Sequence, residues 1–87
     1  MKIIANKETF QEELPGLAEY LINALLILGI KLNEYEFASV IGKEKKSVLP
    51  TYEVIFDHNT YPCALWILID RNEDSSFKIT QILFNFT

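Results

Sequence analysis

The last quarter of the chain most constrains its fold, because two apolar runs there flank a polar turn. Residues 64–70 read ALWILID and residues 77–86 read FKITQILFNF, with RNEDSS between them. Such β-branched and aromatic runs around a turn cluster predict an antiparallel hairpin. The first strand has two apolar faces, one made by Cys63, Leu65, Ile67 and Ile69 and the other by Ala64, Trp66 and Leu68. A strand of this kind needs cover on both sides, so we expect one face to pack under a helix and the other to meet a partner.

The size and the composition of the chain predict apolar surface in excess of what its own core can bury. The chain has 87 residues, of which 49% are hydrophobic and 13% aromatic. This length predicts a single domain, residues 1–87, and a domain of this size buries only about 60–65% of the surface of its unfolded chain. The remaining apolar surface favours a homodimer, a partner-binding face or a lined pocket.

The N-terminal third carries the periodicity of a helix. Thr9 and Glu12 have capping-box spacing, which predicts that a helix begins at the next residue after Thr9. Pro15 cannot donate a backbone hydrogen bond and predicts a kink or a short turn. From Leu21 onward the segment is apolar nearly all round, which predicts burial on more than one side. Gly29 is the expected stop.

Residues 34–41 fit two structures. Asn33 with Glu36 has the spacing to cap a short helix, whereas the aromatic and β-branched residues between Tyr35 and Ile41 favour a strand. We adopt the strand, joined by a polar loop to a second strand over residues 48–57.

The second and the last of these strands show period-two patterns. Residues 48–57 place Tyr52, Val54 and Phe56 on one face. In the last strand the apolar positions change from odd to even numbers, and such a change needs one extra residue. We therefore expect a β-bulge near Thr80 and Gln81.

These elements predict an α+β fold in which one long, kinked N-terminal helix packs on a four-stranded antiparallel β-meander. The short apolar tip at residues 1–5 is a candidate edge strand. The layout is similar to that of cystatin-like folds and of small cone-like domains of the nuclear-transport-factor type. This is a likeness of architecture and carries no function with it.

The charge balance argues against two classes of partner. Eight Lys and Arg face twelve Asp and Glu, and the net charge is −4. No basic stripe is available for a phosphate backbone or an anionic membrane surface, so we expect no direct nucleic-acid binding and no membrane binding. The apolar segment 17–30 is too short to span a bilayer. A single cysteine excludes an intramolecular disulfide, and the expected location is the cytoplasm.

The chain offers few groups for catalysis or metal binding. His58 and Cys63 could form a dyad or bind a metal, but both arrangements need further groups that one His and one Cys cannot supply. Carboxylate pairs, such as Glu53 with Asp57 or Asp57 with Asp70, fit a solvated rim better than a desolvated site. We therefore expect no catalytic residue, no metal and no cofactor.

The leading interpretation is a non-catalytic protein-binding module that occludes a partner with a basic surface, as inhibitors, immunity proteins and phage anti-defence proteins do. The residues expected to bind the partner are Trp66, Glu12, Glu19, Tyr61 and Phe84. A homodimer is also expected. The alternative is a small-molecule-binding or enzymatic domain with a pocket on the concave sheet face, where Asp57, His58, Tyr61 or Asp70 would supply polar groups. A closed cavity lined by Trp66 and Phe84 would favour the alternative, and a flat patch would favour the binding module.

Overall fold

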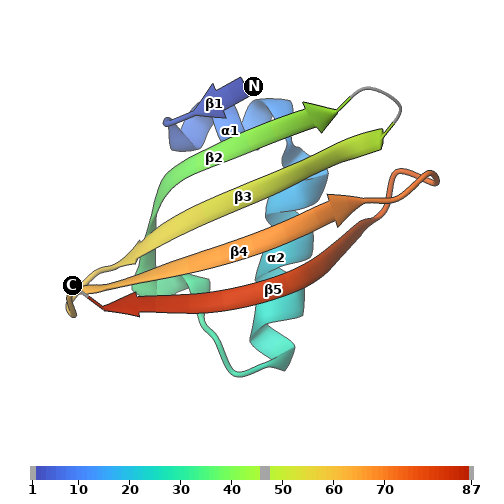
Figure 1. Cartoon of the computed structure of the whole chain (residues 1–87). Helices are drawn as coiled ribbons and strands as arrows, with labels where there is room; N and C mark the ends of the chain where they lie inside the picture. Colours follow the sequence, from blue (N-terminus) through green and yellow to red (C-terminus); the bar gives the residue numbers. More distant parts are fainter. Residues whose placement is uncertain (1, 46–47, 87) are drawn as a thin grey trace.

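In a computed structural model that describes residues 2–45 and 48–86, two α-helices pack on one face of a five-stranded antiparallel sheet (Figure 1). The elements are β1 (Lys2–Ile4), α1 (Lys7–Glu13), α2 (Pro15–Ile27), the 3-10 turn η1 (Leu32–Glu34), β2 (Tyr35–Lys45), β3 (Val48–His58), β4 (Cys63–Arg71) and β5 (Phe77–Phe86). The strands lie side by side in chain order. The expected α+β class, and the strand rather than the helix after residue 34, are confirmed. The expected number of strands is wrong, because β1 pairs with β2 and places Ile4 opposite Val40.

The N-terminal segment forms two helices, so the prediction of one long helix is wrong. Leu14 separates them with φ −130° and ψ 53°, and Pro15 is the first residue of α2. Proline lacks the N–H that would continue α1, and its ring clashes with the preceding turn, so it ends one helix and begins another. The predicted capping box is also wrong. Asn6 is the cap, and its side-chain oxygen accepts hydrogen bonds from the N–H groups of Glu8 (2.8 Å) and Thr9 (3.3 Å).

The end of α2 confirms the predicted stop at Gly29, which has φ +82°. The N–H of Gly29 donates to the carbonyl of Leu26 (3.0 Å), and the N–H of Ile30 donates to that of Leu25 (2.9 Å). This is a Schellman motif, which needs the left-handed conformation that glycine adopts most easily. No helix in the described ranges is long and apolar enough to cross a membrane.

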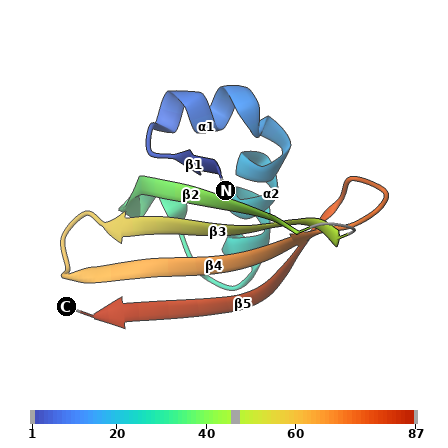
Figure 2. The ribbon, with the colours of Figure 1, turned by 45° about the horizontal axis from the view of Figure 1, so that its top comes forward.

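The C-terminal end of α2 is not buried on several sides as predicted. Leu17, Leu21 and Leu25 form the single stripe that faces the sheet, and each is 0% exposed. The other sides of the helix carry exposed aliphatic side chains, namely Ile22, Leu26, Ile27 and Leu28. In Figure 2, α2 lies behind the strands and follows directly on α1.

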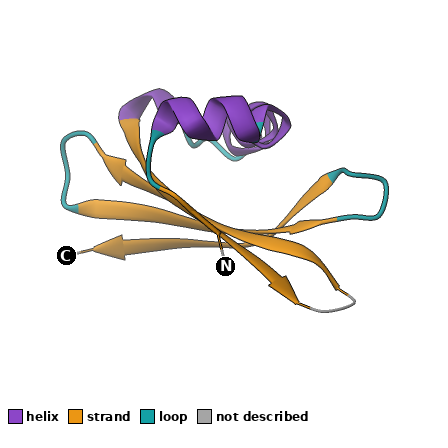
Figure 3. Cartoon of the chain, turned by 90° about the horizontal axis from the view of Figure 1, so that it is seen from above, coloured by secondary structure: helices purple, strands orange, loops and turns teal. Residues whose placement is uncertain are grey.

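Both helices lie on the same side of the sheet, which leaves the other side uncovered (Figure 3). The core fills the space between the two layers, and its buried members are Ile4, Phe10, Leu17, Leu21, Leu25, Val40, Val54, Phe56, Leu65, Ile67 and Ile69. Every strand except β5 contributes a buried side chain to this layer. The molecule therefore has one helix-covered sheet face and one open sheet face.

The hairpin of β4 and β5 and its alternation are confirmed. Leu65, Ile67 and Ile69 point under the helices and are 0% exposed. Trp66 and Leu68 alternate with them, so they point to the uncovered side, where they are half-buried. Burial of the three aliphatic side chains stabilises the fold by about 1.5–3 kcal/mol each.

The β-bulge in β5 is also confirmed. Leu68 lies opposite Gln81 and Ile69 lies opposite Ile79, so Thr80 is the extra residue. The Thr80 hydroxyl donates to the Leu68 carbonyl at 3.2 Å, and the Ile79 N–H donates to the Tyr20 hydroxyl of α2 at 3.3 Å. Hydrogen bonds at the bulge therefore connect the edge strand β5 both to β4 and to α2.

Candidate functional site

The uncovered side of the sheet presents a broad apolar patch. We call this side the open face and define it by six apolar side chains, Ile3, Ile41, Ile55, Trp66, Leu68 and Leu83. The register places Ile55, Trp66 and Leu83 directly opposite one another on three adjacent strands. Residues opposed in an antiparallel sheet share a face, so these three side chains form a continuous row.

Two acidic residues lie beside this row. The register places Glu36 of β2 opposite Asp57 of β3, on the same side as Ile55. Both side chains are exposed, and neither forms an ion pair within the part of the chain that the structure describes. Like charges that face each other across two strands destabilise the sheet. We call Glu36 and Asp57 the acidic pair.

The other end of the open face is charge-balanced. Lys43 Nζ lies 3.8 Å from Glu53 Oε2, and Asp70 lies opposite Lys78 in the register. A shallow hollow of about 140 Å³ lies here, lined in part by Lys43, Glu53 and Asp70. Neither Trp66 nor Phe84 lines this hollow. Glu53 binds Lys43 rather than sharing a site with Asp57.

The structure does not gather the residues predicted for partner binding into one patch. Trp66 alone lies on the open face. Glu12 and Glu19 are exposed residues of α1 and α2, in the layer on the other side of the sheet. Phe84 is half-exposed and lies opposite Leu65, so it points to the helix side of β5. Tyr61 lies exposed in the loop between β3 and β4.

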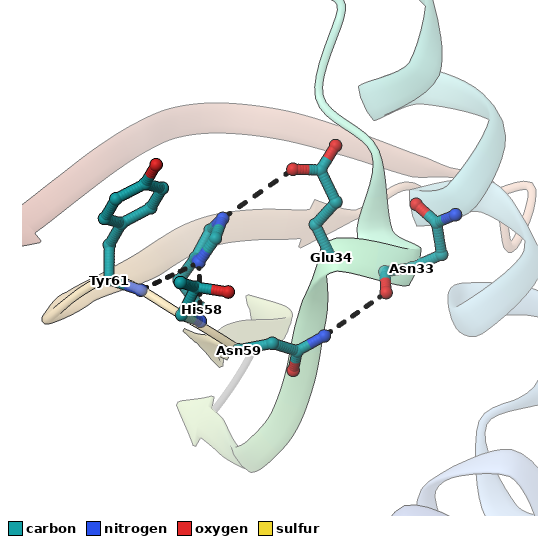
Figure 4. Close-up of polar contacts among 6 residues, drawn as sticks. Asn33, Glu34, His58, Asn59 and Tyr61 are labelled. Carbon is teal, nitrogen blue, oxygen red and sulfur yellow. Dashed lines mark hydrogen bonds and ion pairs between the residues drawn. The ribbon is translucent and has the colours of Figure 1, made fainter.

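His58 organises the loop between β3 and β4 (Figure 4). Its Nδ1 accepts hydrogen bonds from the N–H groups of Thr60 (3.0 Å) and Tyr61 (3.1 Å). Its Nε2 lies 3.7 Å from the carboxylate of Glu34. The side chain is 13% exposed, so this histidine is more buried than a typical turn residue. Both ring nitrogens therefore lie next to polar groups of the local structure.

Two further contacts tie this loop to the start of β2. The Asn59 N–H donates to the Glu34 carbonyl at 2.9 Å, and its side-chain amide donates to the Asn33 carbonyl at 3.4 Å (Figure 4). Tyr35 packs edge-on against the His58 ring, with centroids 4.9 Å apart. Burial raises the pKa of the Tyr35 phenol, and the neighbouring Cys63 and Glu34 add to the rise.

Cys63 occupies an ordinary strand position. Its thiol is half-buried, and Sγ lies 3.9 Å from the carbonyl of Ala64. Among the described residues no three His, Cys, Asp or Glu side chains are grouped closely enough to hold a metal ion. The chain matches no protein-family model, and comparison with curated proteins and with solved structures gives no match.

Sequence reasoning missed most of the open face. The alternation of β4 indicated that Leu68 shares a side with Trp66, but the alternation alone did not show that Ile55 of β3 lies on the same side. The acidic pair was missed because it depends on register. Ala38 is an extra residue in β2, between the pairs formed by Phe37 and Ser39, and this bulge sets which residues of β2 face β3.

Proposed function

We propose that the protein is a small, non-catalytic protein-binding module whose open face binds a basic surface of a partner protein. The module acts by occlusion, as inhibitors, immunity proteins and anti-defence proteins do. The observation that carries the proposal is the row of Ile55, Trp66 and Leu83 beside the exposed acidic pair.

The apolar row has the composition of an interface centre. Protein interfaces concentrate their binding energy in a few large residues, among which Trp is enriched, surrounded by polar ones that exclude water. Trp66 lies in the middle of the row, and the acidic pair and the Lys43–Glu53 ion pair lie around it. Trp66 lies outside the small hollow of this face, and an open sheet face suits a protein surface better than a small molecule, which prefers a concave site.

The acidic pair selects a basic partner. Glu36 and Asp57 repel each other in the free protein, and a lysine or arginine placed between them would remove that repulsion. The net charge of −4 adds long-range attraction for a basic partner and raises the association rate. Glu12 and Glu19 contribute only to this long-range term, because they lie in the helix layer.

Affinity capture with matched baits tests the proposal. The parent chain, Trp66→Ala and Ile27→Ala are immobilised in parallel and exposed to a lysate of the native host. Ile27 is the control, since it is 86% exposed on α2 and remote from the open face. A partner of the open face is retained by the parent and by Ile27→Ala and lost from Trp66→Ala.

The affinity of any such partner is then measured by calorimetry. Trp66→Ala should raise Kd by about thirtyfold or more, which is the range of a hot-spot residue. Glu36→Gln with Asp57→Asn should slow association and reduce its salt dependence. A partner that ignores Trp66→Ala but fails to bind Ile27→Ala would contradict the proposal and assign binding to α2.

The homodimer stays a prediction, and a second copy would compete for the same surface. Light scattering of the purified chain at micromolar concentration measures its mass. A monomer leaves the open face available to the partner. A dimer that Trp66→Ala dissociates would show instead that the open face binds another copy of this chain.

A further inference from the structure

A second and larger hollow lies on the helix side of the sheet. We call it the helix-side cavity; it has a volume of about 580 Å³ and lies between α1, α2, the 30–33 loop and strands β2 and β3. This volume is within the range of about 300–1,000 Å³ that is typical of small-molecule sites. The cavity shares no lining residue with the open face, which lies on the other side of the sheet.

The floor and one wall of the cavity are aromatic. Phe37 stacks on Phe10 with centroids 4.7 Å apart and meets Phe56 edge-on at 5.9 Å. Phe10 and Phe56 are buried, so these rings are held in place by the core beneath them. Such stacked and edge-on pairs are more stable than burial alone predicts. The floor is therefore a preformed apolar surface.

The opposite wall is aliphatic and comes from α2. Ile22 and Leu26 line the cavity, yet their side chains are 53% and 58% exposed. They belong to the apolar end of α2 that the protein's own core leaves uncovered. A ligand with a hydrocarbon body would cover these side chains and the aromatic floor together, and each buried CH₂ group would favour binding by about 0.8 kcal/mol.

The charged groups of the cavity are of one sign. Lys7 and Lys31 line it, and no acidic residue does among those that the structure describes. Within the described ranges, neither lysine forms an ion pair. The first acidic residue that follows Lys31 in the sequence is Glu34. Its carboxylate lies 3.7 Å from Nε2 of His58. Two lysines beside an apolar hollow are unexpected in a protein of net charge −4, and they complement an anion.

We propose that the helix-side cavity binds a free medium-chain fatty acid or a similar apolar monocarboxylate. The hydrocarbon chain lies on Phe37 and Phe56 and is covered by Ile22 and Leu26, and the carboxylate binds Lys7 or Lys31. A carboxylate hydrogen-bonded to a lysine ammonium forms a charge-assisted contact, which is stronger than a neutral one. The ligand covers the apolar end of α2 without any contact to the open face.

Calorimetry with decanoate and decanol tests the proposal, because the two ligands share a chain and differ in charge. Decanoate should bind the parent with one-to-one stoichiometry and about tenfold more tightly than decanol, the preference expected for one charge-assisted contact. Added salt should weaken the binding of decanoate and leave the binding of decanol unchanged. This salt comparison needs no variant.

Variants locate the two parts of the ligand. Lys7→Gln with Lys31→Gln should abolish the preference for decanoate, whereas Lys78→Gln, which removes a lysine on the open face, should keep it. Leu26→Ser should weaken the binding of both ligands. Ile27→Ser, on the same helix but outside the cavity, should weaken the binding of neither.

The single tryptophan gives an independent control on location. Trp66 lies on the far side of the sheet, so its emission should not change when decanoate binds. Equal affinity for decanoate and decanol in the parent, a preference that survives in the double lysine variant, or a shift of Trp66 emission on binding would each overturn the proposal.

Discussion

The open face and the helix-side cavity are built from neighbouring residues of the same strands. On β3, Ile55 and Asp57 point to the open face, while Phe56 between them lines the cavity. The open face carries two exposed acidic residues and a hollow of only about 140 Å³, whereas the helix-side cavity has a volume of about 580 Å³ and is lined by two lysines. Because side chains alternate along a strand, one short sequence can build two surfaces of different shape and opposite charge.

The difference also concerns how much each face contributes to stability. The helix-covered face holds the core, so its residues stabilise the fold. The residues of the open face gain less from folding, since side chains such as Trp66 and Leu68 are only half-buried. Large residues of the open face, such as Trp66, are available for binding.

The largest expected effect compares two adjacent residues of β4. Ile67→Ala leaves a cavity in the core and should lower the free energy of unfolding by about 3 kcal/mol. Trp66→Ala removes a larger side chain from the open face and should lower it by only about 1 kcal/mol. Urea denaturation measures both. An equal or larger loss for Trp66→Ala would mean that the open face is part of the core of the protein.

The next effect concerns the loop that joins β3 and β4. His58→Ala removes the acceptor for the N–H groups of Thr60 and Tyr61 and should lower the free energy of unfolding by about 1 kcal/mol. Cys63→Ala should have a smaller effect. Partner binding by both variants should stay within a few-fold of the parent. Loss of binding in both, with an unchanged circular dichroism spectrum, would restore a functional role for these two residues.

A smaller effect of opposite sign is expected at the acidic pair. Asp57→Asn removes the repulsion with Glu36 and should stabilise the free protein by about 0.2–1 kcal/mol at low salt, the range of cross-strand pairs. The gain should shrink as salt is added. Asp70→Asn is the matched control, because Asp70 faces Lys78 and its removal should not stabilise the protein. Equal effects of the two substitutions would show that the acidic pair carries no particular strain.

The smallest effect is a pH dependence of stability that comes from Tyr35 on the helix-covered sheet face. Burial raises the pKa of Tyr35 above its usual value of 10.0, so the folded protein holds this proton more tightly than the unfolded chain does. The resulting stability is complete below pH 10 and is lost as the pH rises through the folded-state pKa. Melting temperatures measured across alkaline pH should therefore fall less steeply for Tyr35→Phe. An identical decline in both proteins would indicate that Tyr35 is as hydrated as in the unfolded chain.

The local elements could be predicted from the sequence where one residue type has one strong effect. Pro15 ended a helix, Gly29 terminated the next, and the change of apolar parity located the bulge at Thr80. The cap was wrong because Asn6 and Thr9 are both good caps and only the structure distinguishes them.

The two surfaces could be predicted only in part. The alternation of β4 separates Trp66 from Ile67, but a strand that is apolar on both sides does not indicate which side the helices cover. The acidic pair depends on a one-residue bulge at Ala38, and the cavity depends on how α1 and α2 lie across the sheet. Register and the placement of helices are tertiary properties that short-range patterns do not specify.

The most direct test of the central claim is to find which surface becomes covered in the complex with a captured partner. Methyl NMR with a soluble paramagnetic probe reports the solvent access of individual aliphatic side chains in the free and bound states. Methyl groups of Ile55 and Leu83 on the open face should lose their relaxation enhancement on binding, and those of Ile22 and Ile27 on α2 should keep it. Protection of α2 with continued exposure of the open face would contradict the account.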